Sequence, residues 1–209
     1  MNKILLNILL LLCTYSGVLG QPVTNRSTSG LAASILFVGN SLTYTNNLPE
    51  LVVEAAELKG IVLKTEMLAL PNYAIIDHWS DGEVQNLISN KKYDFVIIQQ
   101  GPSSQKAGRR MLIEDGQKYD SLCALHDVKL CYFMVWPALP NFQTFDAVIK
   151  NYTDAARINN ALIIPVGEVW KAYFERTHDV QYYASDGFHP SLKGSQIAAE
   201  VIVDHLFRE

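Results

Sequence analysis

The chain has 209 residues, of which 49% are hydrophobic and 18% are charged. This composition is typical of a globular protein and excludes an intrinsically disordered chain. The length suits one domain with a sizeable core. The formal net charge of −4 argues against nucleic acid as a partner, because a polyanion is bound by a basic surface.

Residues 1–20 have the pattern of a secretory signal peptide. One lysine precedes an apolar run from Ile4 to Cys13, and small or turn-forming residues follow up to Gly20. The run is too short to span a bilayer comfortably, and Asn7 interrupts it. We therefore expect a secreted or periplasmic protein, cleaved after Gly20, with no membrane span after cleavage.

Residues 21–33 are predicted to be a flexible segment, because they are mostly polar and have no periodicity. Residues 34–209 are then the folded domain. Asn25 and Asn151 each begin a glycosylation sequon, which is used only if the source organism glycosylates exported proteins.

From residue 34 onward, apolar runs alternate with helical patterns. The predicted strands cover residues 34–39, 61–68, 93–100, 128–137 and 161–167. The predicted helices cover residues 49–60, 80–92, 109–127, 142–160, 168–178 and about 191–209. Continuous apolar strands separated by helices predict a parallel sheet covered on both faces, with right-handed crossovers. We expect a three-layer α/β/α sandwich, flavodoxin-like, with a five-stranded parallel sheet.

Two cysteines follow the signal segment, Cys123 in a predicted helix and Cys131 in a predicted buried strand. An exported chain can form disulfides. These positions nevertheless favour two buried thiols over a bond.

The first strand runs into Gly39-Asn40-Ser41, which places Ser41 at a strand's carboxyl end. Ligands bind at this edge of the sheet in doubly wound folds. A serine in this place can instead simply cap a helix. Its interpretation therefore depends on whether the chain also supplies a base.

The stretch SDGFHPS, residues 185–191, supplies a histidine and a carboxylate in one loop. A serine hydroxyl needs a base to remove its proton, and histidine serves well near neutral pH. A carboxylate orients the imidazole and stabilises its charged form. Ser41, His189 and Asp186 have these three chemistries. Gly187 permits the bend between the last two, and Ser191 can cap the final helix.

GNSLT after the first strand and DGFHPS before the last helix resemble the signatures of the SGNH (GDSL-type) hydrolases. The resemblance covers residues 34–208 and is strongest to secreted bacterial members. It implies the flavodoxin-like fold, no organic cofactor, no metal and hydrolysis of small-molecule or glycan esters. It also implies that Ser41 is the nucleophile, His189 the base and Asp186 its partner.

The same resemblance implies an oxyanion hole made of three donors. The Ser41 N–H is the first. Asn72, in LPNYAIIDHW, stands where the family has a glycine, and asparagine tolerates a left-handed backbone. The family's third block ends in G-x-N, but this chain has IIQQGPSS, so Gln99 or Gln100 would supply the amide. We favour Gln100.

Two other residues near these motifs have alternative interpretations. His78 either lines the substrate cleft or packs against the short helix that follows it. Trp136 ends the fourth predicted strand and either stacks on a sugar or belongs to the core. The remaining histidines do not show metal-ligand spacing with carboxylates.

The leading hypothesis is a secreted serine esterase that deacetylates carbohydrates. A carbohydrate-binding protein without catalysis is an alternative, motivated by the altered second and third blocks. Acyl transfer to an alcohol acceptor is another, since the same triad serves both reactions.

Overall fold

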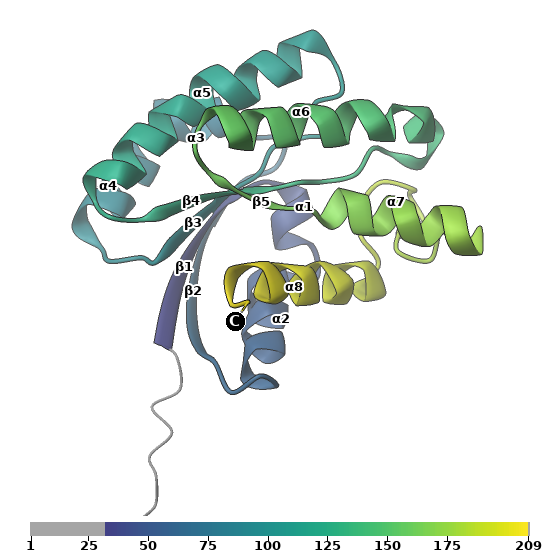
Figure 1. The fold of residues 1–209 in the computed structure, drawn as a ribbon, viewed down its shortest axis with the longest axis horizontal. Helices are drawn as coiled ribbons and strands as arrows, with labels where there is room; N and C mark the ends of the chain where they lie inside the picture. The colour runs from purple at the N-terminus through teal and green to yellow at the C-terminus, as the bar shows by residue number, and fades with distance from the viewer. Residues whose placement is uncertain (1–31, 209) are drawn as a thin grey trace, which may run out of the picture.

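A computed structural model describes residues 32–208, and its core is one sheet of five parallel strands (Figure 1). The strand order is β2-β1-β3-β4-β5. The strands are β1 (Ala32–Gly39), β2 (Val62–Ala69), β3 (Phe95–Ile98), β4 (Lys129–Phe133) and β5 (Leu162–Ile164). This order is that of flavodoxin-like proteins, so the predicted fold class is confirmed.

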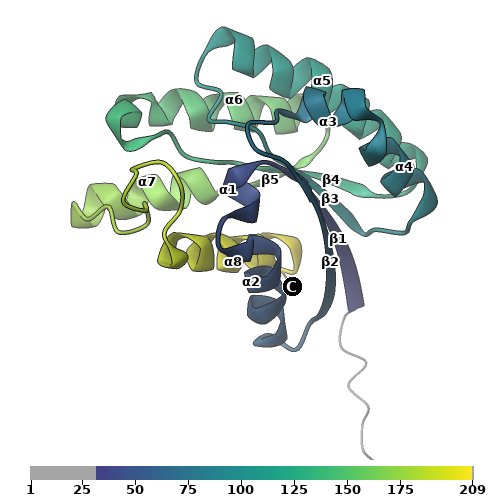
Figure 2. The ribbon, with the colours of Figure 1, turned by 180° about the vertical axis from the view of Figure 1, so that it is seen from behind.

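Helices cover both faces of the sheet. In Figures 1 and 2, α2 and α8 lie together on one face, and α3, α4, α5 and α6 lie on the other. The α-helices are α1 (Ser41–Tyr44), α2 (Leu48–Glu57), α3 (Ile75–Asp81), α4 (Glu83–Asn90), α5 (Lys106–Leu125), α6 (Phe145–Ile158), α7 (Val166–Thr177) and α8 (Leu192–Leu206). Two 3-10 segments, η1 (Thr45–Asn47) and η2 (Leu139–Thr144), precede α2 and α6.

The inner strands of the sheet are continuous apolar runs because both faces of the sheet are buried. All four residues of β3 are buried, and Ile97 lies between Phe37 of β1 and Cys131 of β4. Alternation is absent from such strands because neither face meets water. The edge strand β2 is only partly buried, and its pattern is correspondingly mixed.

Several predicted boundaries were wrong. The first strand starts at Ala32, so residues 32–33 belong to the sheet and not to a flexible segment. The signal peptide and the rest of the predicted flexible segment lie outside the described residues. Most of helix α3 was not predicted, since the predicted helix 80–92 covers only its last two residues and then α4. Helix α3 has seven residues, so its periodicity is short, and the Asp77 carboxylate caps it by accepting from the Ala74 N–H at 2.8 Å.

The two cysteines of the described residues are free and buried, as the sequence favoured. Burial raises the pKa of Cys123 to about 12 and raises that of Cys131 as well. The sequon at Asn151 is not available in the folded chain, because Asn151 is 7% exposed and its amide donates to the Ser103 carbonyl at 2.8 Å. None of the helices within residues 32–208 is long and apolar enough to cross a membrane.

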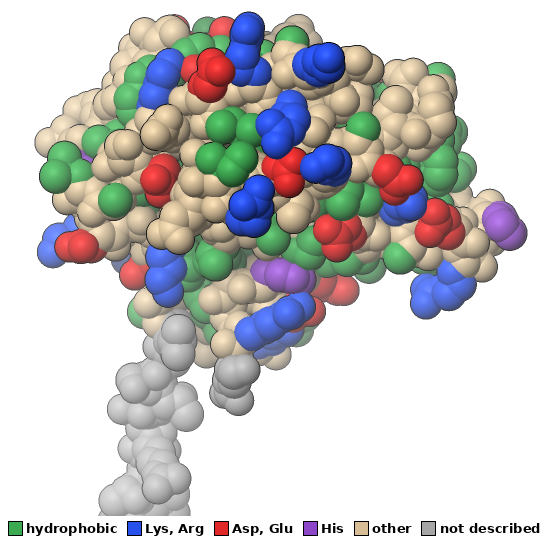
Figure 3. Space-filling view, turned by 45° about the horizontal axis from the view of Figure 1, so that its top comes forward, with side chains coloured by type: hydrophobic (Ala, Val, Ile, Leu, Met, Phe, Trp, Pro, Cys, Tyr) green, Lys and Arg blue, Asp and Glu red, His purple; other side chains and the backbone are tan. Residues whose placement is uncertain are grey.

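The surface over α5 and α6 has mixed charge. Figure 3 brings these helices toward the viewer and shows Lys and Arg side chains interspersed with Asp and Glu. Arg109 and Lys150 both contact Asp154 at 2.8 Å, and Lys118 contacts Asp115 at 2.8 Å. Positive and negative groups therefore neutralise one another here.

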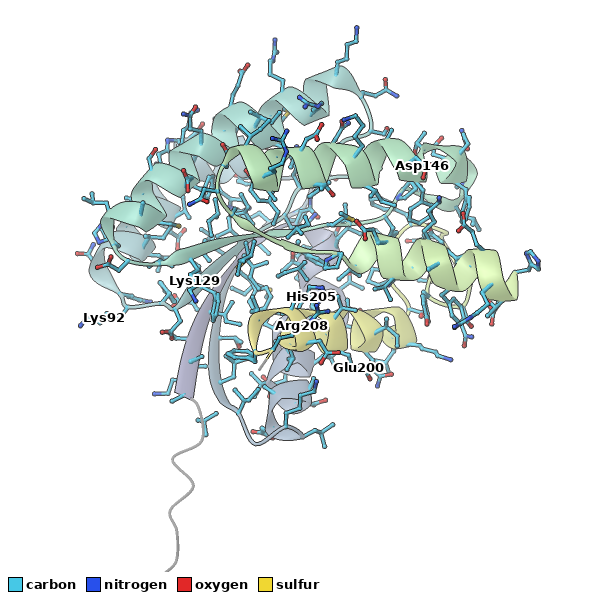
Figure 4. All side chains as sticks on the ribbon, in the orientation of Figure 1. Lys92, Lys129, Asp146, Glu200, His205 and Arg208 are labelled. Carbon is cyan, nitrogen blue, oxygen red and sulfur yellow. The ribbon has the colours of Figure 1, made fainter. Side chains whose placement is uncertain are left out.

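A hollow of about 770 Å³ lies at the amino ends of the strands. Two of its lining residues, Lys129 and Arg208, are labelled in Figure 4. Lys129 begins β4, so this hollow lies at the sheet edge opposite to the one where β1 ends. Its lining includes neither a serine nor a histidine, whereas ligands in this topology bind at the opposite, carboxyl edge.

Candidate active site

Ser41 is the first residue of α1, directly beyond the carboxyl end of β1. Asn40 caps this helix with an extended backbone, and its side-chain oxygen accepts from the Leu42 N–H at 3.1 Å. The cap starts a helix where none was predicted. It fixes the backbone from which the half-buried Ser41 side chain projects.

Gly39, two residues before Ser41, lies where neighbouring side chains leave no room for a Cβ atom. Its φ is not positive, so a left-handed backbone is not the reason for a glycine. A Cβ at this position would collide with the Thr43 hydroxyl and the Gln99 amide oxygen. The glycine therefore lets these two side chains pack against the backbone of the Ser41 turn.

The structure brings Ser41, His189 and Asp186 together although 148 positions in the chain separate the serine from the histidine. The His189 Nε2 lies 2.9 Å from the Ser41 Oγ. On the other side of the ring, Nδ1 lies 2.6 Å from the Asp186 Oδ2. Serine, imidazole and carboxylate are thus linked by two consecutive hydrogen bonds.

The loop geometry explains how an aspartate and a histidine three positions apart can face each other. Gly187 between them has φ +66°, in the left-handed region. The Asp186 Oδ1 accepts from the N–H groups of Phe188 and His189, each at 2.9 Å, which closes the turn. The hydrogen bond from His189, and then that from the Phe188 N–H, lowers the pKa of Asp186.

An ionised Asp186 determines which histidine nitrogen carries the proton. A carboxylate only accepts, so Nδ1 donates to it. In the neutral ring, Nε2 then keeps its lone pair, which faces the Ser41 hydroxyl. This arrangement can remove a proton from Ser41.

Asn72 adopts the left-handed backbone expected of it, with φ +63°. It follows Pro71 in a turn closed by the Tyr73 N–H and the Leu70 carbonyl at 3.3 Å. Proline followed by a residue with positive φ is typical of a type II turn. The turn is tied to the residues before Ser41, because the Leu70 N–H donates to the Gly39 carbonyl at 3.2 Å and the Asn40 amide to the Tyr73 carbonyl at 2.9 Å.

Two N–H groups at this edge are free of protein acceptors. Within residues 32–208, neither the Ser41 N–H nor the Asn72 N–H donates a hydrogen bond to another group. Ser41 has this property because the first N–H groups of a helix lack an intrahelical partner. An anionic oxygen formed at this edge of the sheet would require free N–H groups of this kind as donors.

Gln99 is a structural residue. Its Oε1 accepts from the Asn40 N–H at 3.0 Å and the Thr43 hydroxyl at 2.8 Å. Its Nε2 donates to the Asn40 Oδ1 at 3.1 Å and the Gln100 carbonyl at 2.7 Å. All four hydrogen-bonding positions of the amide are occupied, and they hold the turn that carries Ser41.

The side-chain contacts of Gln100 do not support the role favoured for it in the oxyanion hole. Its Nε2 donates to the Ser103 Oγ at 2.8 Å and to the Gly108 carbonyl at 3.3 Å, on the side of α5. The side chain is 2% exposed. Both amide hydrogens thus stabilise the loop after β3, a contact that the residue type alone does not reveal.

His78 packs in the interior and does not line the cleft. It is 1% exposed, and its Nε2 donates to the Gly39 carbonyl at 2.7 Å. Burial, which outweighs this hydrogen bond and the nearby carboxylates, lowers the pKa of His78. Sequence reasoning named the residue but not its partner, since the partner is a backbone carbonyl 39 positions away.

Trp136 belongs to the core and cannot stack on a sugar. It is fully buried and stacks on Trp170, with ring centroids 3.5 Å apart. Its indole nitrogen donates to the Phe188 carbonyl at 3.0 Å. The ring therefore lies beneath the loop that carries His189.

A second, smaller hollow adjoins Asn72. It measures about 350 Å³ and is lined by Pro71, Asn72, Tyr73, Asp77, Ser80 and Asp81. An aromatic ring, a hydroxyl and two carboxylates therefore face solvent beside the turn.

No family model and no curated protein sequence matches this chain. Solved structures do share its fold. A candidate SGNH hydrolase from Slackia heliotrinireducens is 21% identical, with a TM-score of 0.71, covering 84% of this chain and 100% of its own.

Two esterase-type structures are also similar. A variant of an acetyl-xylooligosaccharide esterase from Geobacillus stearothermophilus is 15% identical, with a TM-score of 0.69, covering 86% of this chain and 96% of its own. A lipase/acylhydrolase from Enterococcus faecalis is 17% identical, with a TM-score of 0.66, covering 83% and 95%. The fold of this chain is therefore the one on which these hydrolases are built.

Proposed function

We propose that this chain is an SGNH-type serine esterase, with Ser41 as nucleophile, His189 as general base and Asp186 as the carboxylate that orients it. The observation that carries the proposal is the pair of hydrogen bonds linking Ser41 to His189 and His189 to Asp186 at the carboxyl edge of the sheet. Two independent supports agree with it. The motifs around these residues resemble those of SGNH hydrolases, and hydrolases of that kind share the fold.

Acylation begins when the Ser41 oxygen attacks an ester carbonyl carbon. His189 takes the hydroxyl proton at Nε2, and Asp186 stabilises the imidazolium. The tetrahedral intermediate collapses, the carbon–oxygen bond to the alcohol breaks, and His189 returns its proton to the leaving alkoxide. Water then attacks the acyl-enzyme by the same route and releases the acid.

The negative oxygen of the tetrahedral intermediate needs donors that are already in place. Of the three donors that the resemblance implies, the N–H groups of Ser41 and Asn72 have no acceptor among the described contacts. Such a donor lowers the barrier by about 3 kcal/mol. Gln100 would have to leave Ser103 and Gly108 to become a third, so we omit it from the resting site.

The alcohol part of the substrate is proposed to be a carbohydrate. Carboxylates and an aromatic ring in the hollow beside Asn72 are suited to the hydroxyl groups and faces of a sugar. The predicted signal peptide, residues 1–20, agrees with a substrate outside the cell. One of the proteins that share the fold is an acetyl-xylooligosaccharide esterase.

Hydrolysis of para-nitrophenyl acetate by the chain lacking residues 1–20, beside Ser41→Ala, tests the esterase proposal. We expect turnover by the wild type and none by the variant, with equal thermal stability. A phosphonate probe should label Ser41 in the wild type only. Turnover that survives Ser41→Ala would exclude this serine as the nucleophile.

Absence of both turnover and labelling would favour the carbohydrate-binding alternative. If turnover is found, product analysis with and without an added sugar acceptor separates hydrolysis from acyl transfer. Acetylated xylo-oligosaccharides then test the carbohydrate part, since a preference over simple acetate esters is expected.

A further inference from the structure

The four consecutive backbone carbonyls from Gly187 to Pro190, around His189, each accept a hydrogen bond. The Gly187 carbonyl accepts from the Leu139 N–H at 2.7 Å, and the His189 carbonyl accepts from the Ala184 N–H at 2.8 Å. The carbonyls on either side of the histidine are bound by side chains instead. Trp136 Nε1 donates to the Phe188 carbonyl at 3.0 Å, and Asn46 Nδ2 donates to the Pro190 carbonyl at 3.1 Å.

Trp136 approaches the loop from inside the protein. It follows β4, is fully buried, and stacks on the equally buried Trp170. A tightly packed indole has no freedom to move its N–H, so the Phe188 peptide is held at a fixed position. This peptide joins directly to the backbone nitrogen of His189.

Asn46 approaches from the segment that carries Ser41. It lies in η1, just after α1, and its backbone is left-handed with φ +57°. Its amide also donates to the Ser195 Oγ at 3.0 Å, and Ser195 is 1% exposed on α8. The exposed Asn46 side chain thus connects the segment that carries Ser41 with the loop that carries His189 and with helix α8.

We propose that Trp136 and Asn46 are positioning residues that hold His189 within hydrogen-bonding distance of Ser41. This inference rests on the proposed function. The 2.9 Å contact joins two segments that are far apart in the chain, so their relative position needs direct connections. Asn46 supplies one between the two segments, and Trp136 anchors the histidine loop to the core. Neither touches the reacting atoms.

The tryptophan pair provides a matched control for Trp136. Trp136→Phe removes the indole N–H that bonds to Phe188. Trp170→Phe removes the same atoms from the stacked neighbour, whose Nε1 is buried without a partner among the described residues. Both variants lose similar packing, but only the first loses a hydrogen bond to the histidine loop.

The adjacent asparagines provide a matched control for Asn46. Asn47 is also exposed and left-handed, with φ +51°, and its side chain makes no capping hydrogen bond. Glycine adopts a left-handed backbone without strain. Asn46→Gly and Asn47→Gly therefore change the backbone equally, and only the first removes the amide that bonds to Pro190.

The experiment measures kcat and KM for para-nitrophenyl acetate, with melting temperatures, in all four variants. We expect kcat to fall about tenfold or more in Trp136→Phe and Asn46→Gly, with KM little changed, because a misplaced base slows chemistry without removing a substrate contact. Trp170→Phe and Asn47→Gly should retain the wild-type kcat.

A double-mutant cycle separates positioning from general damage. In a His189→Ala background, Asn46→Gly and Trp136→Phe should cost nothing further, because no base remains to be positioned. Equal losses in both backgrounds, or losses shared by the control variants, would overturn the proposal. So would wild-type kcat in Trp136→Phe and Asn46→Gly.

Failure of the proposed function itself looks different, because the wild type would then neither turn over ester nor react with phosphonate. If Trp136→Phe does not fold, Asn46→Gly and Asn46→Asp decide the matter. The aspartate keeps the size of the side chain but cannot donate to Pro190, so its kcat should fall with that of the glycine variant.

Discussion

Replacing Asp186 with asparagine should remove most of the activity while leaving the loop folded. In the native loop, one carboxylate oxygen accepts two backbone N–H groups and the other accepts from the His189 Nδ1. The asparagine carbonyl can keep the first two hydrogen bonds. Its amide group then presents hydrogens to Nδ1, which must become an acceptor.

The magnitude follows from this change of tautomer. If Nδ1 accepts, the ring proton moves to Nε2, which then points a hydrogen at the Ser41 hydroxyl and cannot take another proton. Loss of a triad aspartate in this way costs on the order of 10⁴-fold in kcat, which is about 5 kcal/mol of barrier. Asp186 is half exposed, so water can restore the correct tautomer for part of the time, and we expect a loss of about 10³- to 10⁴-fold.

The assay is kcat/KM for para-nitrophenyl acetate between pH 6 and 9, with circular dichroism to verify the fold. Asp179→Asn is the matched control, because the Asp179 carboxylate also accepts a backbone N–H in an exposed turn but makes no hydrogen bond to a histidine. It should behave like the wild type. Activity of Asp186→Asn within about tenfold of the wild type would contradict the assignment of Asp186 as the orienting carboxylate.

Three further predictions concern the stability of the fold and the burial of its side chains. Burial lowers the pKa of His78 in the folded protein below its ordinary value of 6.5. The unfolded chain therefore binds a proton at His78 more readily than the folded protein does. The free energy of unfolding should then fall as the pH drops below about 6.5. Urea midpoints at pH 7.5 and 5 should differ less in His78→Gln, and an unchanged difference would contradict this account. Gly116→Ala should destabilise the protein by about 1–3 kcal/mol, because the alanine Cβ would collide with the Tyr132 hydroxyl. Without such a neighbour, replacing a glycine inside a helix with alanine would increase the stability of the protein. In the native protein, neither Cys123 nor Cys131 should react with Ellman's reagent, because both thiols are buried. Both should react in denaturant. Reaction of either thiol in the native protein would show that it is accessible to solvent.

The sequence predicted well those parts of the fold that have continuous apolar runs or contacts between residues close together in the chain. The continuous apolar runs at 35–38 and 95–98 identified buried parallel strands, because only a sheet covered on both faces tolerates them. Asp186 and His189 could be paired in advance because they lie only three positions apart, with a glycine between them. Short helices such as α3 gave no clear period and were missed.

The assignment of polar side chains near the site needed the tertiary structure. Two adjacent glutamines look equivalent in sequence, yet Gln99 holds the turn before Ser41 and Gln100 holds the loop before α5. Which of them is free to donate depends on neighbours that come from other parts of the chain. Amide orientation of this kind leaves no periodic signal.

By itself, the sequence determined the fold class, the sheet edge at which the candidate site lies, and the pairing of Asp186 with His189. These follow from hydrophobic patterning and from contacts within a few residues, which a linear chain displays directly. Only the tertiary structure decided that His189 lies 2.9 Å from Ser41 and that Trp136 and Asn46 bind the carbonyls beside it. Such contacts join distant segments through individual carbonyl groups, whose directions are determined by the packing of the whole domain and not by any local pattern.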